Sequence, residues 1–355
     1  MSQKLRARDY NIPFGVLPKG KYNAITDVKG VKVGPVTKIE GEHIRTGVTA
    51  ILPHDGNIFQ NKVPAAVFVG NGFGKLVGST QIIELGTLES PVILTNTLSI
   101  ASGIEGIVRY TLAMQGNEKV KSVNAVVGET NDSHLNDIRG LHISSSDVIQ
   151  AINNAKDGPL DEGNVGAGTG TVCFGWKGGI GSASRKLPES LGGYTIGVLV
   201  QTNFGGNLQI AGMPAGKILE KYSFQDDIKN SDGSCMIVVA TDAPILERNL
   251  ERIAQRAMMG LAKTGGIASN GSGDYVIAFS TAEHLRQSHQ NKKLELDSFQ
   301  VLNNNDISPL FMATIEATEE AIINSLFAAE TMRGFEGHLI EKIPVEKISE
   351  WFKIK

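Results

Sequence analysis

Residues 232–244, DGSCMIVVATDAP, combine a turn, a short apolar strand and the start of a helix in one continuous run. The polar, glycine-containing segment before Ser234 is typical of a turn, and the β-branched segment 236–240 is typical of a strand in a covered sheet. The boundary between loop and strand is therefore expected at Gly233 and Ser234.

The Gly233–Ser234 bond has the residue types that self-cleavage needs. Glycine admits backbone angles closed to other residues, so the bond can be held bent with its carbonyl exposed to the serine hydroxyl. An N-to-O acyl shift followed by ester hydrolysis would make Ser234 the first residue of a new chain. Its α-amine, with an ordinary pKa of about 8, could then act as a general base near neutrality. A surface turn before a core strand is the simpler interpretation of the same spacing.

Composition restricts the class of protein. With 355 residues, the chain can hold one large domain or two around a substantial core. A formal net charge of −3 gives no electrostatic reason to expect nucleic acid or an anionic membrane as a partner. No apolar stretch is long enough to span a bilayer, and no signal-peptide pattern is present, so a cytoplasmic protein is expected.

Cysteines and histidines give no sign of a metal site. Cys173 and Cys235 lie in apolar, strand-like runs and are expected to be buried structural thiols. Because adjacent strand residues point to opposite faces, Cys235 should point away from a site that Ser234 faces. None of the seven histidines pairs with another at metal-ligand spacing, so no metal and no cofactor are expected. A Ser-His-Asp triad stays an alternative, although no Gly-x-Ser-x-Gly motif marks a serine for it.

Apolar strands and amphipathic helices alternate along the chain, which indicates a layered α/β architecture. Ser144 is expected to cap one helix, and Thr241 or Asp242 a second helix that has Pro244 in its first turn and ends at Gly265. The predicted strands are 28–36, 47–52, 63–69, 91–94, 124–128, 194–201, 236–240 and 275–280; the other predicted helices are 99–114, 313–331 and the weaker 343–355.

Two further segments are distinguished by their glycine or polar content. Residues 163–181 hold eight glycines, but no Gly-Lys-Ser/Thr sequence follows them. Close packing of backbone on backbone is therefore preferred over a phosphate-binding loop. The polar loop 222–232 is the best linker in the chain and leads to the Gly233–Ser234 turn, where an exposed backbone can be cut.

Four motifs follow one another along the chain: VVGETND at 126–132, GVLVQTNFG at 197–205, GSCMIVVATDAP at 233–244 and NGSGDY at 270–275. Together they resemble the L-aminopeptidase/D-esterase family of self-cleaving serine peptidases, which includes the β-peptidyl aminopeptidases. The similarity extends to residues 6–28 and to the glycine-rich centre. It implies a four-layer α-β-β-α sandwich, a fold that is similar to that of the ornithine acetyltransferases.

The resemblance also implies one domain, residues 1–355, that is cut once into associated chains 1–233 and 234–355. Ser234 would then release N-terminal amino acids, L-α, D-α or β, from short peptides, amides or esters that have a free amine. An acyl-enzyme on Ser234 and a homo-oligomer, specifically a homotetramer, are implied as well.

Site roles follow from the resemblance residue by residue. Ser272 and Asp274 match the pair that holds the amine of the catalytic serine, and in an extended segment two such residues face the same side. Asp274 stands where family members can have the longer Glu, so the carboxylate has a shorter reach in this chain. Asn203 matches the oxyanion-hole asparagine, and Glu129 matches the carboxylate that receives the amine of the substrate. Taken alone, each could be an ordinary turn, cap or surface residue.

Asn131 departs from the family pattern. At this position some relatives have a tyrosine that helps to bind the oxyanion, and others have an apolar residue that lines the acyl pocket. The substrate preference of neither subgroup can therefore be transferred. Two other functions stay open. One is an acyltransferase like the ornithine acetyltransferases, which use threonine at the junction, unlike Ser234; the other is an uncleaved, non-catalytic protein of the same fold.

Overall fold

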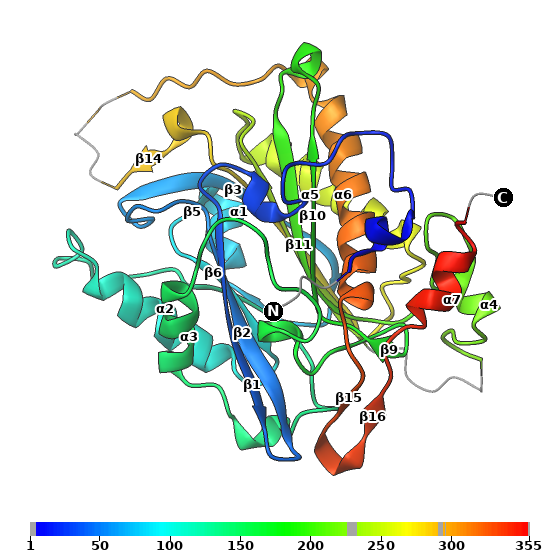
Figure 1. The fold of residues 1–355 in the computed structure, drawn as a ribbon. Coiled ribbons are helices and arrows are strands. Elements are labelled where there is room, and N and C mark those ends of the chain that lie inside the picture. Colours follow the sequence, from blue (N-terminus) through cyan, green and yellow to red (C-terminus); the bar gives the residue numbers. More distant parts are fainter. Residues whose placement is uncertain (1–4, 226–232, 290–293, 295, 354–355) are drawn as a thin grey trace.

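The structure is a computed structural model that describes residues 5–225, 233–289, 294 and 296–353. Two β-sheets lie face to face, and helices cover the outer face of each sheet (Figure 1). One apolar core fills the space between the sheets, and a further core lies beneath each helical layer. The predicted four-layer α-β-β-α sandwich is confirmed.

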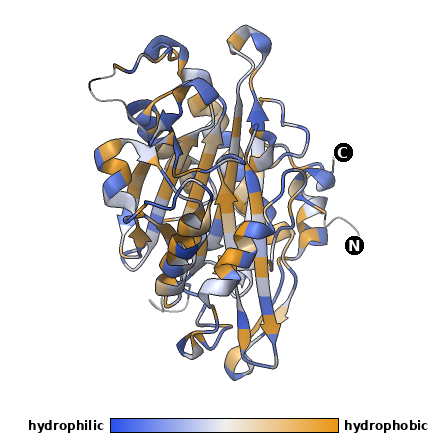
Figure 2. Cartoon of the chain, turned by 90° about the vertical axis from the view of Figure 1, so that its left-hand side faces the viewer, coloured by the Kyte–Doolittle hydropathy of each residue, from blue (hydrophilic) through white to orange (hydrophobic). Residues whose placement is uncertain are grey.

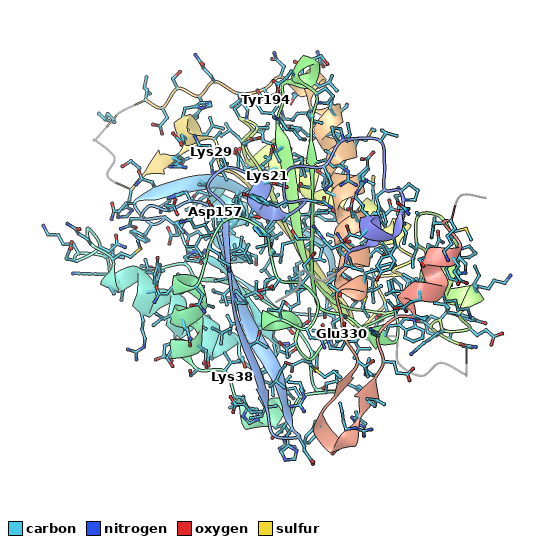
Figure 3. The ribbon with its side chains drawn as sticks, in the orientation of Figure 1. Lys21, Lys29, Lys38, Asp157, Tyr194 and Glu330 are labelled. Carbon is cyan, nitrogen blue, oxygen red and sulfur yellow. The ribbon has the colours of Figure 1, made fainter. Side chains whose placement is uncertain are left out.

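The first sheet is covered by α2 (Ile100–Ala113) and α3 (Ser145–Asn153). Ser144 caps α3 as predicted, and its hydroxyl accepts a hydrogen bond from the Asp147 N–H. Lys38 forms a 2.7 Å ion pair with Asp147 and so fastens α3 to the sheet (Figure 3 labels Lys38). The strand order is β1 (Lys32–Glu40), β2 (Ile44–Leu52), β6 (Val92–Asn96), β7 (Val126–Thr130) and β4 (Leu76–Val77).

The second sheet is covered by α5 (Glu247–Lys263) and α6 (Ser308–Phe327). Its central strand β12 pairs antiparallel with β11 and parallel with β13. The strand order is β10 (Ile180–Lys186), β11 (Thr195–Asn203), β12 (Ser234–Thr241), β13 (Gly273–Ser280), β3 (Asn61–Gly72) and β14 (Gln287–Ser288), with β5 (Thr87–Leu88) also pairing with β3.

The interior of the molecule is apolar, and Figure 2 shows hydrophobic residues concentrated on the central strands. Glycines let the layers approach closely, as predicted for the segment 163–181. A Cβ atom on Gly181 would lie 2.0 Å from the carbonyl oxygen of Ala321 in α6. A Cβ on Gly168 would lie 2.3 Å from the backbone nitrogen of Ile180. Backbone therefore packs on backbone in this segment.

The start of α5 differs from the prediction. The helix begins at Glu247, and its N-cap residue is Leu246, so neither Thr241 nor Asp242 caps it and Pro244 precedes it. The Asp242 carboxylate instead accepts a 2.7 Å hydrogen bond from the backbone N–H of Thr195. The side chain that the local sequence assigned to a helix cap therefore makes a tertiary hydrogen bond between two strand ends instead.

The buried face of α2 includes two glycines, whereas the large apolar side chain of Leu112 is 43% exposed. Gly103 and Gly106 lie on the buried face, where a Cβ atom would come within 2.7 Å of Val127 and 2.5 Å of Val148 respectively. The helix approaches the sheet through its small residues, which hydrophobic periodicity does not report.

The remaining predictions hold with shifted bounds: α6 begins before residue 313 and ends at Phe327, and a short helix, α7, lies within the predicted tail. Among the described residues, no helix is both long and apolar enough to cross a membrane. The short elements are α1 (Ser79–Leu85), α4 (Ala215–Ile218), α7 (Val345–Glu350), β8 (Val172–Cys173), β9 (Trp176–Lys177), β15 (Met332–Arg333) and β16 (Leu339–Ile340).

Candidate active site

Three strand ends meet at the first residue of β12. Ser234 lies opposite Asn203, the last residue of β11, and opposite Gly273, the first residue of β13. The strand begins two residues earlier than the predicted 236–240, and the boundary between loop and strand falls at Gly233 and Ser234 as predicted. Ser234 is 7% exposed and faces a cavity.

The Ser234 hydroxyl contacts the peptide unit that precedes it. Its Oγ donates a 2.7 Å hydrogen bond to the carbonyl oxygen of Gly233. The backbone N–H of Gly273 donates to both oxygens, at 3.1 Å to Oγ and 3.2 Å to the carbonyl. A Cβ on Gly233 would lie 2.5 Å from both the Asn203 carbonyl oxygen and the Phe204 Cα, so the site has room only for glycine there.

The side-chain amide of Asn203 is oriented by the neighbouring strand β8. Its Oδ1 accepts a 2.9 Å hydrogen bond from the backbone N–H of Val172. Because a backbone N–H can only donate, the oxygen must face Val172, and the two N–H groups of Nδ2 are left as donors. Asn203 lines the cavity beside Ser234, so an uncharged donor is available next to the hydroxyl.

The cavity has a volume of about 750 Å³ and brings together residues from both sheets. Of the residues expected at one site, Ser234, Asn203, Glu129 and Asn131 line it, whereas Ser272 and Asp274 do not. Asn131 is exposed, and its Oδ1 accepts a 2.9 Å hydrogen bond from the Ser133 N–H. Further lining residues include Phe73, Gly74, Lys75, Thr97, Phe174, Phe204, Lys221, Tyr222 and Phe224.

Glu129 is a buried anion in the wall of the cavity. It lies within β7, is 2% exposed, and accepts hydrogen bonds from the Lys75 N–H at 2.9 Å and from the Thr97 hydroxyl. The Lys75 ammonium lies 3.6 Å from Oε1. A Cβ on Gly74 would lie 3.0 Å from the Gly273 Cα and 3.3 Å from Glu129 Oε1, so Gly74 separates the carboxylate from β13. Glu129 is not a solvated acid at a strand end.

Ser272 and Asp274 are buried polar residues at the start of β13. Each is 1% exposed, and neither the Ser272 hydroxyl nor either Asp274 carboxylate oxygen has a hydrogen-bond partner among the described residues. Burial raises the pKa of Asp274 to about 6. The Ser272 hydroxyl and the Cys235 N–H lie close to the carboxylate and oppose this increase, but neither has the geometry of a hydrogen bond. Unpaired groups of this kind are costly, which points to a partner that they acquire.

The neighbouring thiol plays no part in the cavity. Cys235 is fully buried in the core between the second sheet and its helices, and burial raises the pKa of its thiol well above the ordinary value. Cys235 therefore points away from the face that Ser234 occupies, as predicted. Cys173 is likewise a buried free thiol.

Among the described residues, neither a histidine bonded to Ser234 nor a set of metal ligands is found. The hydrogen bonds of its hydroxyl to described residues involve Gly233 and Gly273 and no histidine. His134 lines the cavity but stacks on His338, with ring centroids 4.4 Å apart. Within the part of the chain that the structure describes, no group of three or more His, Cys, Asp or Glu side chains could hold a metal ion.

Sequence reasoning missed three residues of the site: Lys75, Lys221 and the N–H donor Gly273. Gly273 belongs to the NGSGDY motif, and the glycine-rich segment 70–74 directly follows a predicted strand, which is a signal for close backbone approach. Nothing in the local sequence marks either lysine.

Known proteins resemble the chain over nearly its full length. The model of Peptidase family S58 matches residues 23–340. A β-peptidyl aminopeptidase, BapA, of Sphingosinicella microcystinivorans is 40% identical over 365 residues, covering 96% of this chain and 89% of that protein.

Two solved structures have the same fold. A protein from Pyrococcus horikoshii OT3 is 48% identical, with a TM-score of 0.90 and coverage of 98% of both chains. An L-aminopeptidase D-Ala-esterase/amidase from Ochrobactrum anthropi, described as a prototype for the serine aminopeptidases and a variant of the Ntn hydrolase fold, is 38% identical. Its TM-score is 0.87, with coverage of 97% of this chain and 96% of that one.

These matches confirm the resemblance predicted from the four motifs, and they favour neither an acyltransferase nor a non-catalytic protein. The chain belongs to Peptidase family S58 and is a serine aminopeptidase of the N-terminal-nucleophile type.

Proposed function

We propose that the chain matures by cutting its own Gly233–Ser234 bond. The observation that carries this proposal is the 2.7 Å hydrogen bond from the Ser234 hydroxyl to the Gly233 carbonyl, with the Gly273 N–H donating to both oxygens. Oγ attacks the Gly233 carbonyl carbon, and the Gly273 N–H stabilises the developing oxyanion. The C–N bond breaks, the proton lost by the Ser234 hydroxyl passes to the nitrogen, and an ester on Oγ forms.

Hydrolysis of this ester completes the maturation. Water attacks the ester carbonyl, Gly233 is released as a carboxylate, and the hydroxyl of Ser234 is regenerated beside a new α-amine. The products are chains 1–233 and 234–355, which stay associated because β12 lies in the middle of the second sheet, paired on both sides.

Ser234 then acts as the nucleophile, with its own α-amine as general base. The amine accepts the hydroxyl proton as Oγ attacks the substrate carbonyl and returns it to the leaving amine. Asp274 and Ser272 hold this amine. The support is that they have no hydrogen-bond partner in the part of the chain that the structure describes, together with their position, since Asp274 lies near the N–H of Cys235, one residue after the new terminus.

Asn203 donates from Nδ2 to the oxyanion of the tetrahedral intermediate. The support is its fixed orientation, because Val172 occupies the amide oxygen and leaves the donors beside Ser234. Such an uncharged donor stabilises negative charge that develops only during the reaction.

Glu129 binds the free amine of the substrate, and Asn131 contributes to the wall of the acyl pocket. A buried carboxylate in the cavity of Ser234 supports the first role, since an ammonium needs a counter-charge when it leaves water. The substrates are short peptides, amides or esters with a free N-terminus. β-Amino acids are the favoured acyl residues, a choice that rests on the β-peptidyl aminopeptidase relative.

Two further properties belong to the proposal and rest on the sequence and the family resemblance alone. One is a homotetramer of the mature protein, which light scattering coupled to size-exclusion chromatography tests. The other is a cytoplasmic location, which fractionation of the source cells tests.

The experiment on the proposed function combines two measurements. Intact-mass analysis of purified protein should give two species with termini at Gly233 and Ser234. A panel of aminoacyl p-nitroanilides should then show release of p-nitroaniline from unblocked compounds only. A single full-length species in active protein would contradict the proposal.

A further inference from the structure

The cavity of Ser234 contains a positive charge that the proposed mechanism does not use. Of the two lysines among its described lining residues, Lys75 lies 3.6 Å from Glu129 and is compensated by it. Lys221 forms no ion pair with a carboxylate of the described residues; its contact is with the ring of Trp176, where Nζ lies 3.8 Å from the centroid. The cavity therefore has a cation with no direct ion pair among the described residues; the charge of the Glu341 carboxylate acts on it only as a weaker influence than burial.

Lys221 is held in place by packing. A Cβ on Gly175 would lie 2.7 Å from its Cε atom, so the lysine stem lies against the bare backbone of this exposed glycine. The side chain is half-buried, and burial lowers the pKa of its ammonium. The Glu341 charge opposes this lowering but does not cancel it. An ammonium kept partly out of water without a direct ion-pair partner is costly, and an anionic ligand would relieve that cost.

Lys221 and Glu129 lie on opposite flanks of Ser234. On the β13 flank, Gly273 packs against Gly74, which lies against Glu129. The β11 flank continues from Asn203 into Phe204, whose carbonyl oxygen accepts a 2.7 Å hydrogen bond from the Phe174 N–H. Gly175, the next residue, is the one that Lys221 covers. The nucleophile thus lies between an anion on one side and a cation on the other.

A dipeptide has the same distribution of charge. Its amine lies on the acyl side of its single peptide bond, and its carboxylate lies on the leaving-group side. We propose that Lys221 binds the C-terminal carboxylate of the leaving residue, so that the enzyme prefers free dipeptides over dipeptide amides. This inference rests on the proposed roles of Ser234 and Glu129 and adds a specificity residue for the leaving group.

The test compares leaving groups that differ only in charge. The acyl residue is the one hydrolysed fastest as a p-nitroanilide, and it is joined to leucine or to leucine amide. For the wild-type enzyme, kcat/KM should be about three- to tenfold higher for the free acid, the range expected of one partly buried charge pair. The preference should shrink as salt is added, because counter-ions screen the pair.

Two variants of Lys221 and one control identify the residue responsible. Lys221→Gln should bring the acid-to-amide ratio close to one, and Lys221→Arg should retain the preference. Lys217→Gln makes the same charge change at an exposed lysine of α4 that does not line the cavity, and should keep the wild-type ratio.

An acid-to-amide ratio of one for the wild-type enzyme, or a preference for the acid that persists in Lys221→Gln, would overturn the inference. Hydrolysis of the p-nitroanilides would in that case still support the proposed function. Equal loss of the preference in Lys217→Gln would also overturn it, because the effect would then come from net charge. Failure of the wild-type enzyme to hydrolyse any unblocked p-nitroanilide would refute the proposed function, and the inference with it.

Discussion

The Ser234 hydroxyl donates a hydrogen bond of 2.7 Å to the carbonyl oxygen of Gly233, the residue directly before it in the chain. The same carbonyl accepts the Gly273 N–H at 3.2 Å. The uncut bond is thus polarised by a donor from the neighbouring strand while its nucleophile is already in contact. A serine at an ordinary turn has no need of this second donor.

Replacing Ser234 with Ala should leave the chain uncut and inactive, because the hydroxyl is required for both reactions. A denaturing gel and intact mass give the result. Ser223→Ala removes another serine that lines the cavity and should be cut normally. Cleavage of Ser234→Ala at the same bond would show that another nucleophile acts.

Gly273→Ala should slow self-cleavage without abolishing the nucleophile. A Cβ at this position would lie 2.5 Å from the Gly74 Cα, so the strand must shift and the N–H donor moves with it. The rate of conversion from one band to two, followed after a cell-free synthesis pulse, measures the effect. An unchanged rate would exclude the Gly273 N–H as an oxyanion donor.

Asn203→Asp should lower kcat by about 10²–10³, the cost of one lost oxyanion donor. The variant keeps an oxygen to accept the Val172 N–H, so the local structure is preserved while both Nδ2 donors are lost. Steady-state kinetics on protein confirmed to be cut distinguishes this effect from failed maturation. A kcat within twofold of wild type would rule out the role.

Glu129→Gln should raise KM about tenfold for substrates with a free amine, since a charge pair worth about 1.4 kcal/mol is lost. The amide oxygen can still accept the Lys75 N–H, so the cavity wall stays in place. Glu105→Gln, at an exposed carboxylate of α2, is the matched control. N-acetylated substrates should be poor for both proteins, and equal hydrolysis of blocked and free peptides by the wild type would contradict the role.

Asp274 should destabilise the uncut precursor at neutral pH. Its pKa is about 6 in the folded chain, against a usual value of 3.8, so between these values the folded chain binds the proton more tightly than the unfolded chain. The free energy of unfolding therefore falls as pH rises through this window and stays lower above it, by about 1–3 kcal/mol. Urea unfolding of Ser234→Ala should show this fall, and Ser234→Ala/Asp274→Asn should show a fall smaller by that amount, because burial also raises the pKa of Asp132 and of Glu162 to about 7. The same dependence of the unfolding free energy on pH in both proteins would refute this prediction.

In the mature enzyme, kcat/KM should decline on the acid side with an apparent pKa at or below the value of about 8 for a free α-amine. Asp274→Asn should lower this apparent pKa by removing the charge that favours the ammonium, and Ser272→Ala should lower kcat/KM by loosening the amine. A profile unaltered by both changes, combined with inactivation by His134→Ala, would indicate a histidine mechanism instead.

Local sequence determined the elements that carry the site. The β-branched run after Ser234 predicted β12, the capping sequence at Ser144 predicted α3, and the glycines of 163–181 predicted close backbone packing. The order of the four motifs indicated the fold and the residues Asn203 and Glu129. The strand, the cap and the glycine packing depend on residues near one another in the chain, which is why local sequence patterns report them. The fold and the two site residues were indicated by the family resemblance instead.

Tertiary structure decided which groups meet and what each faces. Glu129 is buried because β7 lies beneath the glycine-rich turn at Gly74. Asp242 does not cap α5, because its carboxylate accepts a hydrogen bond from the first residue of β11. Lys221 shares a cavity with Glu129, although 92 residues separate them in the sequence. Hydrophobic periodicity and capping signals reach only a few residues along the chain, whereas the charge balance of a cavity depends on segments that only folding brings together.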